Sequence, residues 1–162
     1  MAQKKEGINR SPRHLARAFA MLGLYQWLSD KSLRVLDIEP YLPTYVEDNG
    51  EALEECGIFP SDYAKANSQM IHDLLVGVIS RHEEIEALIT KHSNRTSAQV
   101  AMVEHAILYI GAYELIANPE TPWRVVLNEA IDLAKEFGSG YRFANAVLEK
   151  IAREVRPAEV EG

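Results

Sequence analysis

The stretch AILYIGAYELIA, residues 106–117, decides the fold that this sequence predicts. It is long enough for about three helical turns, and Glu114 is its single charged residue. Its other side chains are apolar or aromatic nearly all round, which is typical of a helix enclosed by other helices. We therefore expect residues 106–117 to form the central helix of an all-α fold.

The segments that follow have the periodicity of amphipathic helices. Apolar residues recur at helical spacing in two runs, at Val126, Ala130, Leu133 and Phe137 and at Phe143, Val147 and Ile151. Between the two runs lies the turn FGSGY, in which Gly138 suits the C-terminal cap of a helix. We expect one helix on each side of this turn.

The N-terminal part also begins with a helix signal. Ser11 followed by Pro12 is an N-cap with proline at the first helical position, and the helix is predicted to run to about Ser29. Four of its residues are predicted to lie in the core: Leu15, Phe19, Leu22 and Trp27. Tyr25 is either a packed tyrosine or a surface anchor for a protein partner.

The middle of the chain is less regular. Residues 31–58 predict one or two short helices broken around EPYLP, residues 39–43. Ser61 and Asp62 are predicted to start a long helical region, made of two helices joined near residues 80–83. The polar break HSNRT follows, and Thr96 or Ser97 is expected to cap the next helix.

Together these segments predict an all-α protein of about seven helices. The 162 residues suffice for a single compact bundle, or for two small helical subdomains that share a core. We expect a flexible basic N-terminal arm over residues 1–10, an all-helical domain over residues 11–156 and a frayed tail over residues 157–162.

The charge of the chain is unevenly distributed. The formal net charge is −7, yet residues 1–17 contain five Lys and Arg against Glu6 alone, a balance of +4 that leaves −11 on the rest. The cationic residues of this N-terminal segment are Lys4, Lys5, Arg10, Arg13 and Arg17. An anionic partner such as nucleic acid should therefore be attracted to this end.

Several classes of function have no support in the sequence. The five histidines show no metal-ligand spacing, and neither GxxxxGK[ST] nor GxGxxG occurs, so we expect no metal, no cofactor and no nucleotide cradle. Cys56 lies next to Glu54 and Glu55, whose charges disfavour a reactive thiolate. No apolar run approaches the ~20 residues of a membrane span, and no signal peptide is evident. We expect a cytoplasmic protein that is not an enzyme and has no catalytic residues.

The start of the first helix has an unusual charge pattern. Arg13 and His14 follow Ser11 and Pro12 in the first turn, where the helix dipole favours acidic residues, and each misplaced charge costs roughly 0.3–1 kcal/mol. The same groups become favourable around a phosphate, because helix N–H groups and arginine side chains all donate to it. Arg13 and Arg17 share one face, and we expect their replacement to leave thermal stability unchanged. The alternative is a solvated tail with ordinary surface arginines.

The sequence resembles the NusB family of bacterial transcription antitermination factors over nearly its whole length. SPRHLARAFAMLGLYQW, residues 11–27, is similar to the family's arginine-rich opening and A-L-Y-x-W pattern, with Gly23 where alanine is usual. NEAIDLAKEFG, residues 128–138, is the most specific match, and it is preceded by YEL and followed by FANAVLE, where Ala146 replaces a usual glycine. His14 replaces a common arginine, and His105 and Tyr109 stand at two expected basic positions.

This resemblance implies an RNA-binding adaptor. Family members bind the single-stranded boxA element of nascent RNA together with a ribosomal small-subunit protein that acts as Nus factor E, and they join the elongating RNA polymerase, notably in ribosomal RNA operons. Carried over by position, Arg13, His14 and Arg17 would hold RNA phosphates, with Arg142 and Phe143 close to the RNA. Tyr25 and Glu104 match positions associated with the protein partner.

Two other interpretations remain open. The chain could be a helical protein–protein adaptor whose basic end docks on an acidic protein without contacting RNA. It could also correspond to the helical domain of a ribosomal RNA methyltransferase, although the α/β unit for a methyl donor is absent from this sequence. Self-association of the free chain as a homodimer is left open.

Overall fold

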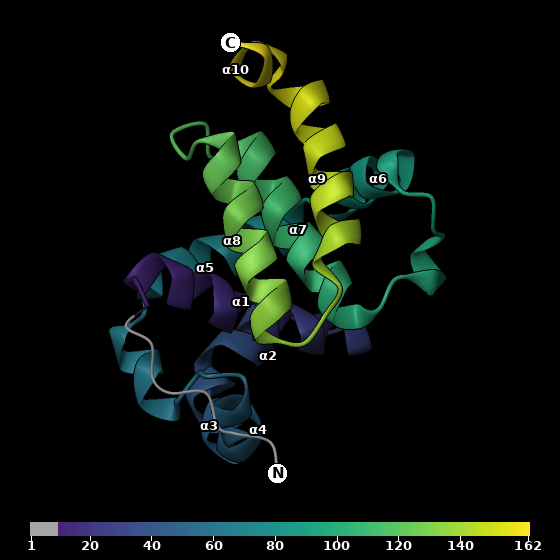
Figure 1. Cartoon of the computed structure of the whole chain (residues 1–162). Coiled ribbons are helices and arrows are strands. Elements are labelled where there is room, and N and C mark those ends of the chain that lie inside the picture. The colour runs from purple at the N-terminus through teal and green to yellow at the C-terminus, as the bar shows by residue number, and fades with distance from the viewer. Residues whose placement is uncertain (1–9) are drawn as a thin grey trace. The chain divides into compact units, whose positions relative to one another are not determined.

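The computed structural model describes residues 10–162, which form ten α-helices and three short 3₁₀ segments with no strand (Figure 1). The predicted all-α class is confirmed. The prediction of about seven helices is wrong, because residues 35–55 and 157–161 fold into more short helices than their sequence indicates. The chain divides into two compact units, an N-terminal unit that ends at Val76 and a C-terminal unit, Gly77–Gly162.

The N-terminal unit is built on the long helix α1 (Pro12–Ser29). Ser11 caps it as predicted, since its Oγ accepts a hydrogen bond from the backbone N–H of His14 at 3.0 Å, and Pro12 occupies the first turn. The predicted core residues of this helix are all buried, namely Leu15, Phe19, Leu22 and Trp27. Every residue of α1 from His14 to Leu24 is buried, so this part of the helix is covered on all its faces.

Four short elements lie within residues 31–58, where one or two helices were expected, and a fifth follows them. They are α2 (Val35–Ile38), the 3₁₀ segment Glu39–Tyr41, α3 (Leu42–Asp48), α4 (Gly50–Glu55) and the 3₁₀ segment Pro60–Lys65. Three of them have proline in their first turn, because proline lacks an N–H and suits a helix start but not its interior. Prolines therefore divide this region more finely than the hydrophobic pattern indicates.

The long helical region begins later than predicted. Helix α5 (Ser68–Ser80) starts after Asn67, whose side-chain oxygen accepts a hydrogen bond from the backbone N–H of Met70 at 3.0 Å. Ser61 and Asp62 lie instead within the preceding 3₁₀ segment, so the prediction that they start the long helix is wrong. The predicted break is confirmed, since α5 ends at Ser80 and α6 (His82–His92) follows.

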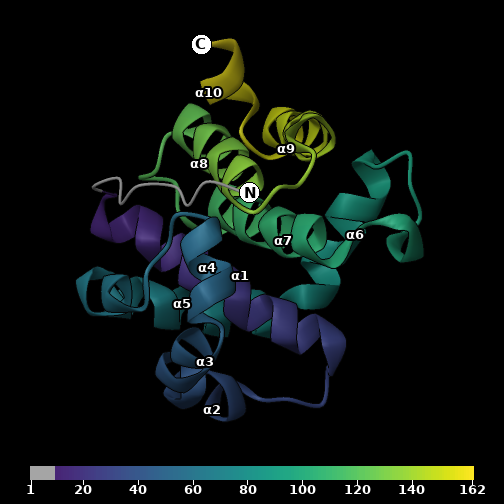
Figure 2. The same ribbon diagram turned by 60° about the horizontal axis from the view of Figure 1, so that its bottom comes forward.

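The C-terminal unit surrounds helix α7 (Met102–Ala117) with α6, α8 (Trp123–Glu136) and α9 (Tyr141–Val155), as Figure 2 shows from a second direction. Eight consecutive residues of α7, from His105 to Ala112, are buried. A run longer than two turns is buried only when neighbours cover every face of a helix. The prediction that this segment forms a central, enclosed helix is therefore confirmed within its unit.

Two turns shape the ends of these helices. Gly138 has a φ of +68°, and the N–H of Ser139 donates to the carbonyl of Ala134 at 2.8 Å, which completes the C-terminal cap predicted for α8. Before α7, Thr96 pairs with Gln99 around the 3₁₀ segment Ser97–Gln99, and α7 itself begins three residues later, without a side-chain cap. Thr96 and Ser97 thus belong to a separate turn, and the expected cap of α7 is wrong.

The end of the chain forms α10 (Pro157–Glu161), where a frayed tail was expected. Arg156 is 9% exposed and its guanidinium donates to four backbone carbonyls near the C-terminal end of α7, those of Glu114, Leu115, Asn118 and Thr121. Glu159 accepts from Arg156 at 3.1 Å and from the backbone N–H of Trp123 at 2.9 Å. These bonds satisfy carbonyls that a helix end leaves unpaired and fix the tail in place.

Candidate nucleic-acid interface

The basic start of α1 is the candidate site of the N-terminal unit. Helix α1 has no acidic residue in its first turn, so its positive dipole end is uncompensated by the helix itself. Arg13 is exposed, whereas His14 and Arg17 are only 7% and 2% exposed. The expectation that replacing both Arg13 and Arg17 leaves thermal stability unchanged therefore does not fit the buried Arg17. Arg13 is the cation of this turn that can meet a ligand directly.

The remaining predicted cations of the N-terminal segment lie before α1. Arg10 is half-buried and donates a 2.7 Å hydrogen bond from Nη1 to the carbonyl of Gly57. This bond ties the residue before α1 to the turn after α4. Lys4 and Lys5 lie outside the described residues.

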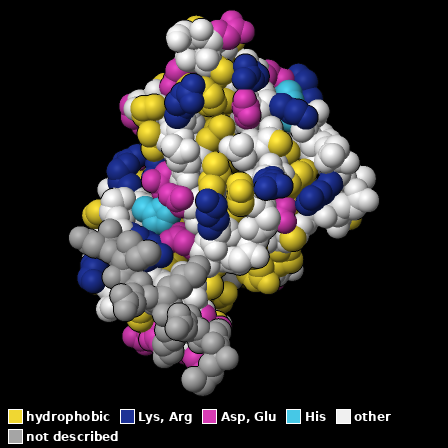
Figure 3. Space-filling model, viewed as in Figure 1, with side chains coloured by type: hydrophobic (Ala, Val, Ile, Leu, Met, Phe, Trp, Pro, Cys, Tyr) yellow, Lys and Arg dark blue, Asp and Glu magenta, His cyan; other side chains and the backbone are white. Residues whose placement is uncertain are grey.

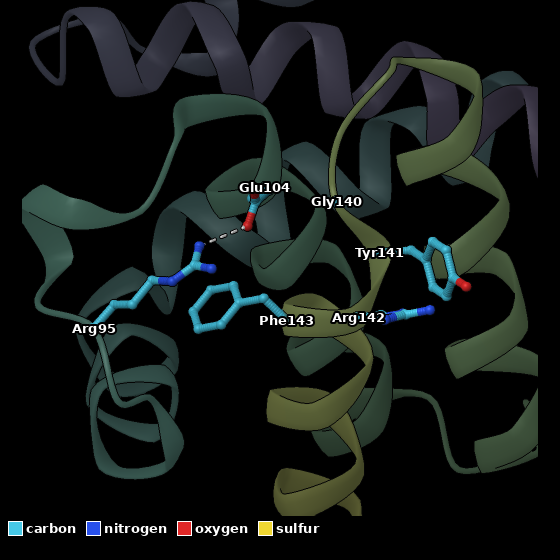
Figure 4. Close-up of a pocket in the computed structure, with 6 residues that line it drawn as sticks. All are labelled: Arg95, Glu104, Gly140, Tyr141, Arg142 and Phe143. Carbon is cyan, nitrogen blue, oxygen red and sulfur yellow. Dashed lines mark hydrogen bonds and ion pairs between the residues drawn. The ribbon is translucent and has the colours of Figure 1, made fainter.

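The C-terminal unit has a candidate site of its own, an open hollow of about 400 Å³ (Figure 4). Its lining residues come from the segment before α7 and from the start of α7 and of α9, and they are Arg95, Glu104, Gly140, Tyr141, Arg142 and Phe143. Three of the residues singled out in the sequence, Glu104, Arg142 and Phe143, are thus brought together.

The centre of the hollow is a stacked pair of Arg95 and Phe143. The guanidinium carbon of Arg95 lies 3.9 Å from the centroid of the Phe143 ring, which is well within cation–π range. Arg95 Nη1 also lies 3.3 Å from Glu104 Oε2. Figure 4 shows the guanidinium beside the ring of Phe143, with a dashed line that marks its ion pair with Glu104. Arg95 was not singled out from the sequence, because nothing in the polar segment around it indicates that its side chain contacts the ring of Phe143.

The rim of the hollow is cationic on the α9 side. Arg142 is exposed in the first turn of α9, and this turn contains no acidic residue. Gly140 is the N-cap and has no side chain to satisfy the first N–H groups of the helix. Lys135 adds a further ammonium group 4.8 Å from the ring of Tyr141. On the face in Figure 3, several Lys and Arg side chains lie among hydrophobic ones over α8 and α9.

The two positions where the family pattern predicts basic residues form a buried polar cluster instead. His105 Nε2 lies 2.7 Å from Glu86 Oε2, and the ring of His105 stacks on that of Tyr109 at 5.0 Å. Ser97 donates to the other Glu86 oxygen at 2.8 Å, and Tyr109 also bonds to this carboxylate. His105 and Tyr109 thus fix α6 to α7.

The Glu86 carboxylate is held in its charged form. Partial burial acts to raise its pKa, but hydrogen bonds from His105, Tyr109 and Ser97 outweigh burial and lower the pKa from 4.5 to about 2. Burial and the same carboxylate raise the pKa of the Tyr109 hydroxyl. The Glu86 carboxylate is therefore a charged group with a structural role, and its hydrogen-bond donors come from the same unit.

The two predicted partner residues have different surroundings. Tyr25 is half-buried on α1, near Tyr45 of α3, whose pKa is raised by burial and to a smaller extent by Tyr25. The Glu104 side chain is 12% exposed and pairs with Arg95, so its carboxylate is already engaged in the unbound chain.

Two other kinds of site receive no support from residues 10–162. No group of three or more His, Cys, Asp or Glu side chains in this range is arranged to hold a metal ion. None of the helices in the same range is long and apolar enough to cross a membrane.

The described residues define an all-α protein with an open hollow lined by arginines and aromatic side chains, and comparison with known proteins narrows the class. The solved structure of T. maritima NusB has the same fold, with a TM-score of 0.67 at 20% identity, covering 95% of this chain and 100% of that one.

Sequence relatives identify the family. The transcription antitermination protein NusB of Laribacter hongkongensis is 39% identical over 154 residues, 94% of this chain and 84% of the relative. The protein of the same name from Bordetella pertussis is 36% identical, covering 94% of this chain and 92% of the relative. Residues 14–153 match the model of the NusB family. The chain belongs to the NusB family of transcription antitermination proteins, as its sequence motifs predict.

Proposed function

We propose that this protein binds the boxA element of nascent RNA together with a ribosomal small-subunit protein acting as Nus factor E. In this role it joins the elongating RNA polymerase in the cytoplasm and promotes antitermination, notably in ribosomal RNA operons. The observation that carries the proposal is the half-buried ring of Phe143 in an open hollow between Arg95 and Arg142, in a chain whose net charge is −7.

The chemistry of this hollow suits single-stranded RNA. An unstacked base can stack on an aromatic ring with ~1–3 kcal/mol, and flanking arginines can donate to the adjacent phosphates. A folded double helix would hide the base faces, so a ring between cations favours a single strand. Phe143 is therefore the proposed base platform and Arg142 a phosphate contact.

The start of α1 supplies the other proposed RNA contacts. Arg13 is exposed beside the N–H groups of the first turn, which makes it the principal phosphate ligand of this unit. Arg10, Lys4 and Lys5 extend the positive charge, while His14 and Arg17 belong to the same proposed patch but support it from buried positions.

The protein partner is proposed to contact Tyr25 and Glu104. Because the residues after position 17 carry a charge of −11, most of this chain repels RNA. A basic ribosomal protein on that surface would relieve the repulsion and add contacts of its own. No cofactor and no catalytic step enter the proposal, which includes self-association of the free chain as a homodimer.

The proposal is tested by fluorescence anisotropy with labelled boxA RNA, with and without the ribosomal partner. Phe143→Leu should weaken binding about tenfold, as expected for one lost stacking interaction. Phe137→Leu is the matched control, because Phe137 is a half-buried phenylalanine of the same unit outside the hollow. Binding that is insensitive to both substitutions would contradict the assignment of Phe143.

The adaptor alternative makes the opposite prediction. If the basic end serves only an acidic protein surface, neither the chain nor its complex with the ribosomal protein will shift the anisotropy of boxA RNA. Exposed apolar side chains at Leu36 and Tyr41, 70% and 64% exposed, offer a surface for such protein contacts.

A further inference from the structure

We propose, on the basis of the RNA-binding function above, that Arg95 is a further phosphate contact and that Glu104 restrains it. In the unbound chain Glu104 holds the Arg95 guanidinium over Phe143. When single-stranded RNA binds, a base takes the place of the guanidinium on the ring, and a phosphate takes the place of Glu104 on the guanidinium.

The geometry shows that the ring is not open on the side of Arg95. A guanidinium carbon 3.9 Å from the ring centroid occupies the volume that a stacked base would need. A base can reach this face of Phe143 only when the Arg95 side chain swings away. The ion pair with Glu104 opposes that movement, since it fixes the other end of the guanidinium at 3.3 Å.

The exposure of the two partners decides which one moves. The side chain of Arg95 is 42% exposed, whereas that of Glu104 is 12% exposed. The backbone of Arg95 is held, because its N–H donates to Ser93 Oγ and its carbonyl accepts from the same hydroxyl, both at 2.9 Å. The long Arg95 side chain can therefore change partner while its backbone and Glu104 stay in place.

The exchange is energetically accessible. The Arg95 guanidinium is solvated when the pair is broken, and its departure opens the Glu104 carboxylate to water, so breaking the pair costs little net free energy. A phosphate offers Arg95 a bidentate, charge-assisted acceptor, and the RNA base recovers the stacking that the guanidinium gives up. Glu104 thus competes with the RNA phosphate for Arg95, which weakens RNA binding without preventing it.

The test compares Glu104→Gln, Arg95→Met and the double variant in anisotropy titrations with boxA RNA over a range of salt concentrations. The ribosomal partner is left out, because Glu104 is also a proposed partner contact. Glu104→Gln should tighten binding roughly threefold, as expected for loss of a weak competing ion pair. Arg95→Met should weaken binding and flatten the log–log salt slope by about 0.7, the value for one phosphate contact on a single strand.

The double variant separates the exchange from a general charge effect. In the Arg95→Met background, Glu104→Gln should no longer tighten binding, because there is no guanidinium left to release. Asp132→Asn is the matched control, since it removes an exposed carboxylate of the same unit outside the hollow. Arg95→Lys should keep the salt slope of the parent chain, because the positive charge remains.

Each contrary outcome has a definite meaning. If Glu104→Gln tightens binding equally with and without Arg95, the carboxylate acts through net charge and the exchange is refuted. If the parent chain binds RNA and Arg95→Met changes neither affinity nor slope, Arg95 is not a contact, while the RNA-binding proposal stands. If no variant binds at any salt concentration without the partner, the exchange in the free chain is refuted, while the RNA-binding proposal is decided by the titration with the ribosomal partner.

Discussion

Glu86 gives a structural role to two positions where the family pattern predicts basic surface residues. Two positions that are basic in the family pattern hold His105 and Tyr109, and both side chains turn to this carboxylate. The Glu86 side chain is 25% exposed, so its charge is only partly solvated and depends on these donors. Relative to the family pattern, the surface therefore has two fewer cations, and hydrogen bonds to Glu86 join α6 to α7.

This attachment predicts an acid-sensitive component of stability. Because hydrogen bonds lower the pKa of Glu86 to about 2, ionised Glu86 stabilises the fold fully above pH ~4.5 and loses that contribution as the pH falls toward 2. Glu86→Gln should lower the free energy of unfolding at pH 7 by about 1–3 kcal/mol. The stability curves of the two proteins, measured by urea unfolding, should converge near pH 2.

The control for this experiment is Glu154→Gln. Glu154 also has a lowered pKa, caused by hydrogen bonds from Lys91 and His92, but its partners are on the surface. A similar loss of stability in both variants would contradict the prediction that the Glu86 cluster contributes more to the free energy of unfolding than a surface ion pair does.

The two arginines of α1 are expected to have different roles, Arg17 in stability and Arg13 in RNA binding. Arg17→Ala should lower the free energy of unfolding by about 1–3 kcal/mol, because it removes a long side chain that is only 2% exposed, together with the packing of its stem. Arg13→Ala should change it by less than about 0.5 kcal/mol, as is usual at an exposed position, while weakening RNA binding. Thermal unfolding and RNA titration of both variants decide the matter, and an unchanged melting temperature for Arg17→Ala would contradict the burial.

At the scale of elements, the approach of α7 and α9 depends on Gly111. An added Cβ at this position would lie 2.7 Å from Leu148 Cδ1, and Leu148 is fully buried. Gly111→Ala should therefore lower stability by about 1–2 kcal/mol, because overpacking exceeds the ~1 kcal/mol gain in helix propensity. In the Leu148→Val background the same substitution should be better tolerated. An additive double variant, measured by chemical denaturation, would show that the two residues do not compete for space.

The elements themselves were largely predictable, and the reason is periodicity. The enclosed helix α7 and the amphipathic faces of α8 and α9 each span several turns, so their pattern is unambiguous. Residues 35–65 were misjudged, because single prolines and local caps such as Asn67 decide such short elements. The tail was misjudged because Arg156 bonds to carbonyls more than thirty residues away.

The candidate site was predictable only in part, for a similar reason. Phe143, Arg142 and Glu104 could be found by their positions in family motifs. Arg95 and the burial of Arg17 could not, because both depend on which side chains the fold brings together. A local pattern shows that a residue is cationic, but only the packed structure shows whether the charge meets solvent, a ring or a carboxylate.

At the scale of the whole molecule, the proposed RNA contacts come from both compact units. Arg13 belongs to the N-terminal unit and Arg142 to the C-terminal unit. The acidic remainder of the chain, with its charge of −11, limits the number of phosphates that the protein can neutralise. A few contacts in each unit, supplemented by a basic partner, should therefore give RNA binding of moderate salt dependence.

This arrangement predicts the salt dependence of the complex with the ribosomal partner. For a handful of neutralised phosphates, the log–log slope of RNA affinity against salt should be roughly −2 to −4. Arg13→Ala and Arg142→Ala should each flatten it by about 0.7, and the double variant by about 1.4. Arg153→Met is the control, because Arg153 pairs with Glu149 on α9 outside the hollow. If one of the two alanine variants keeps the parent slope, the RNA contacts a single unit, because counterions are released only where a phosphate is neutralised.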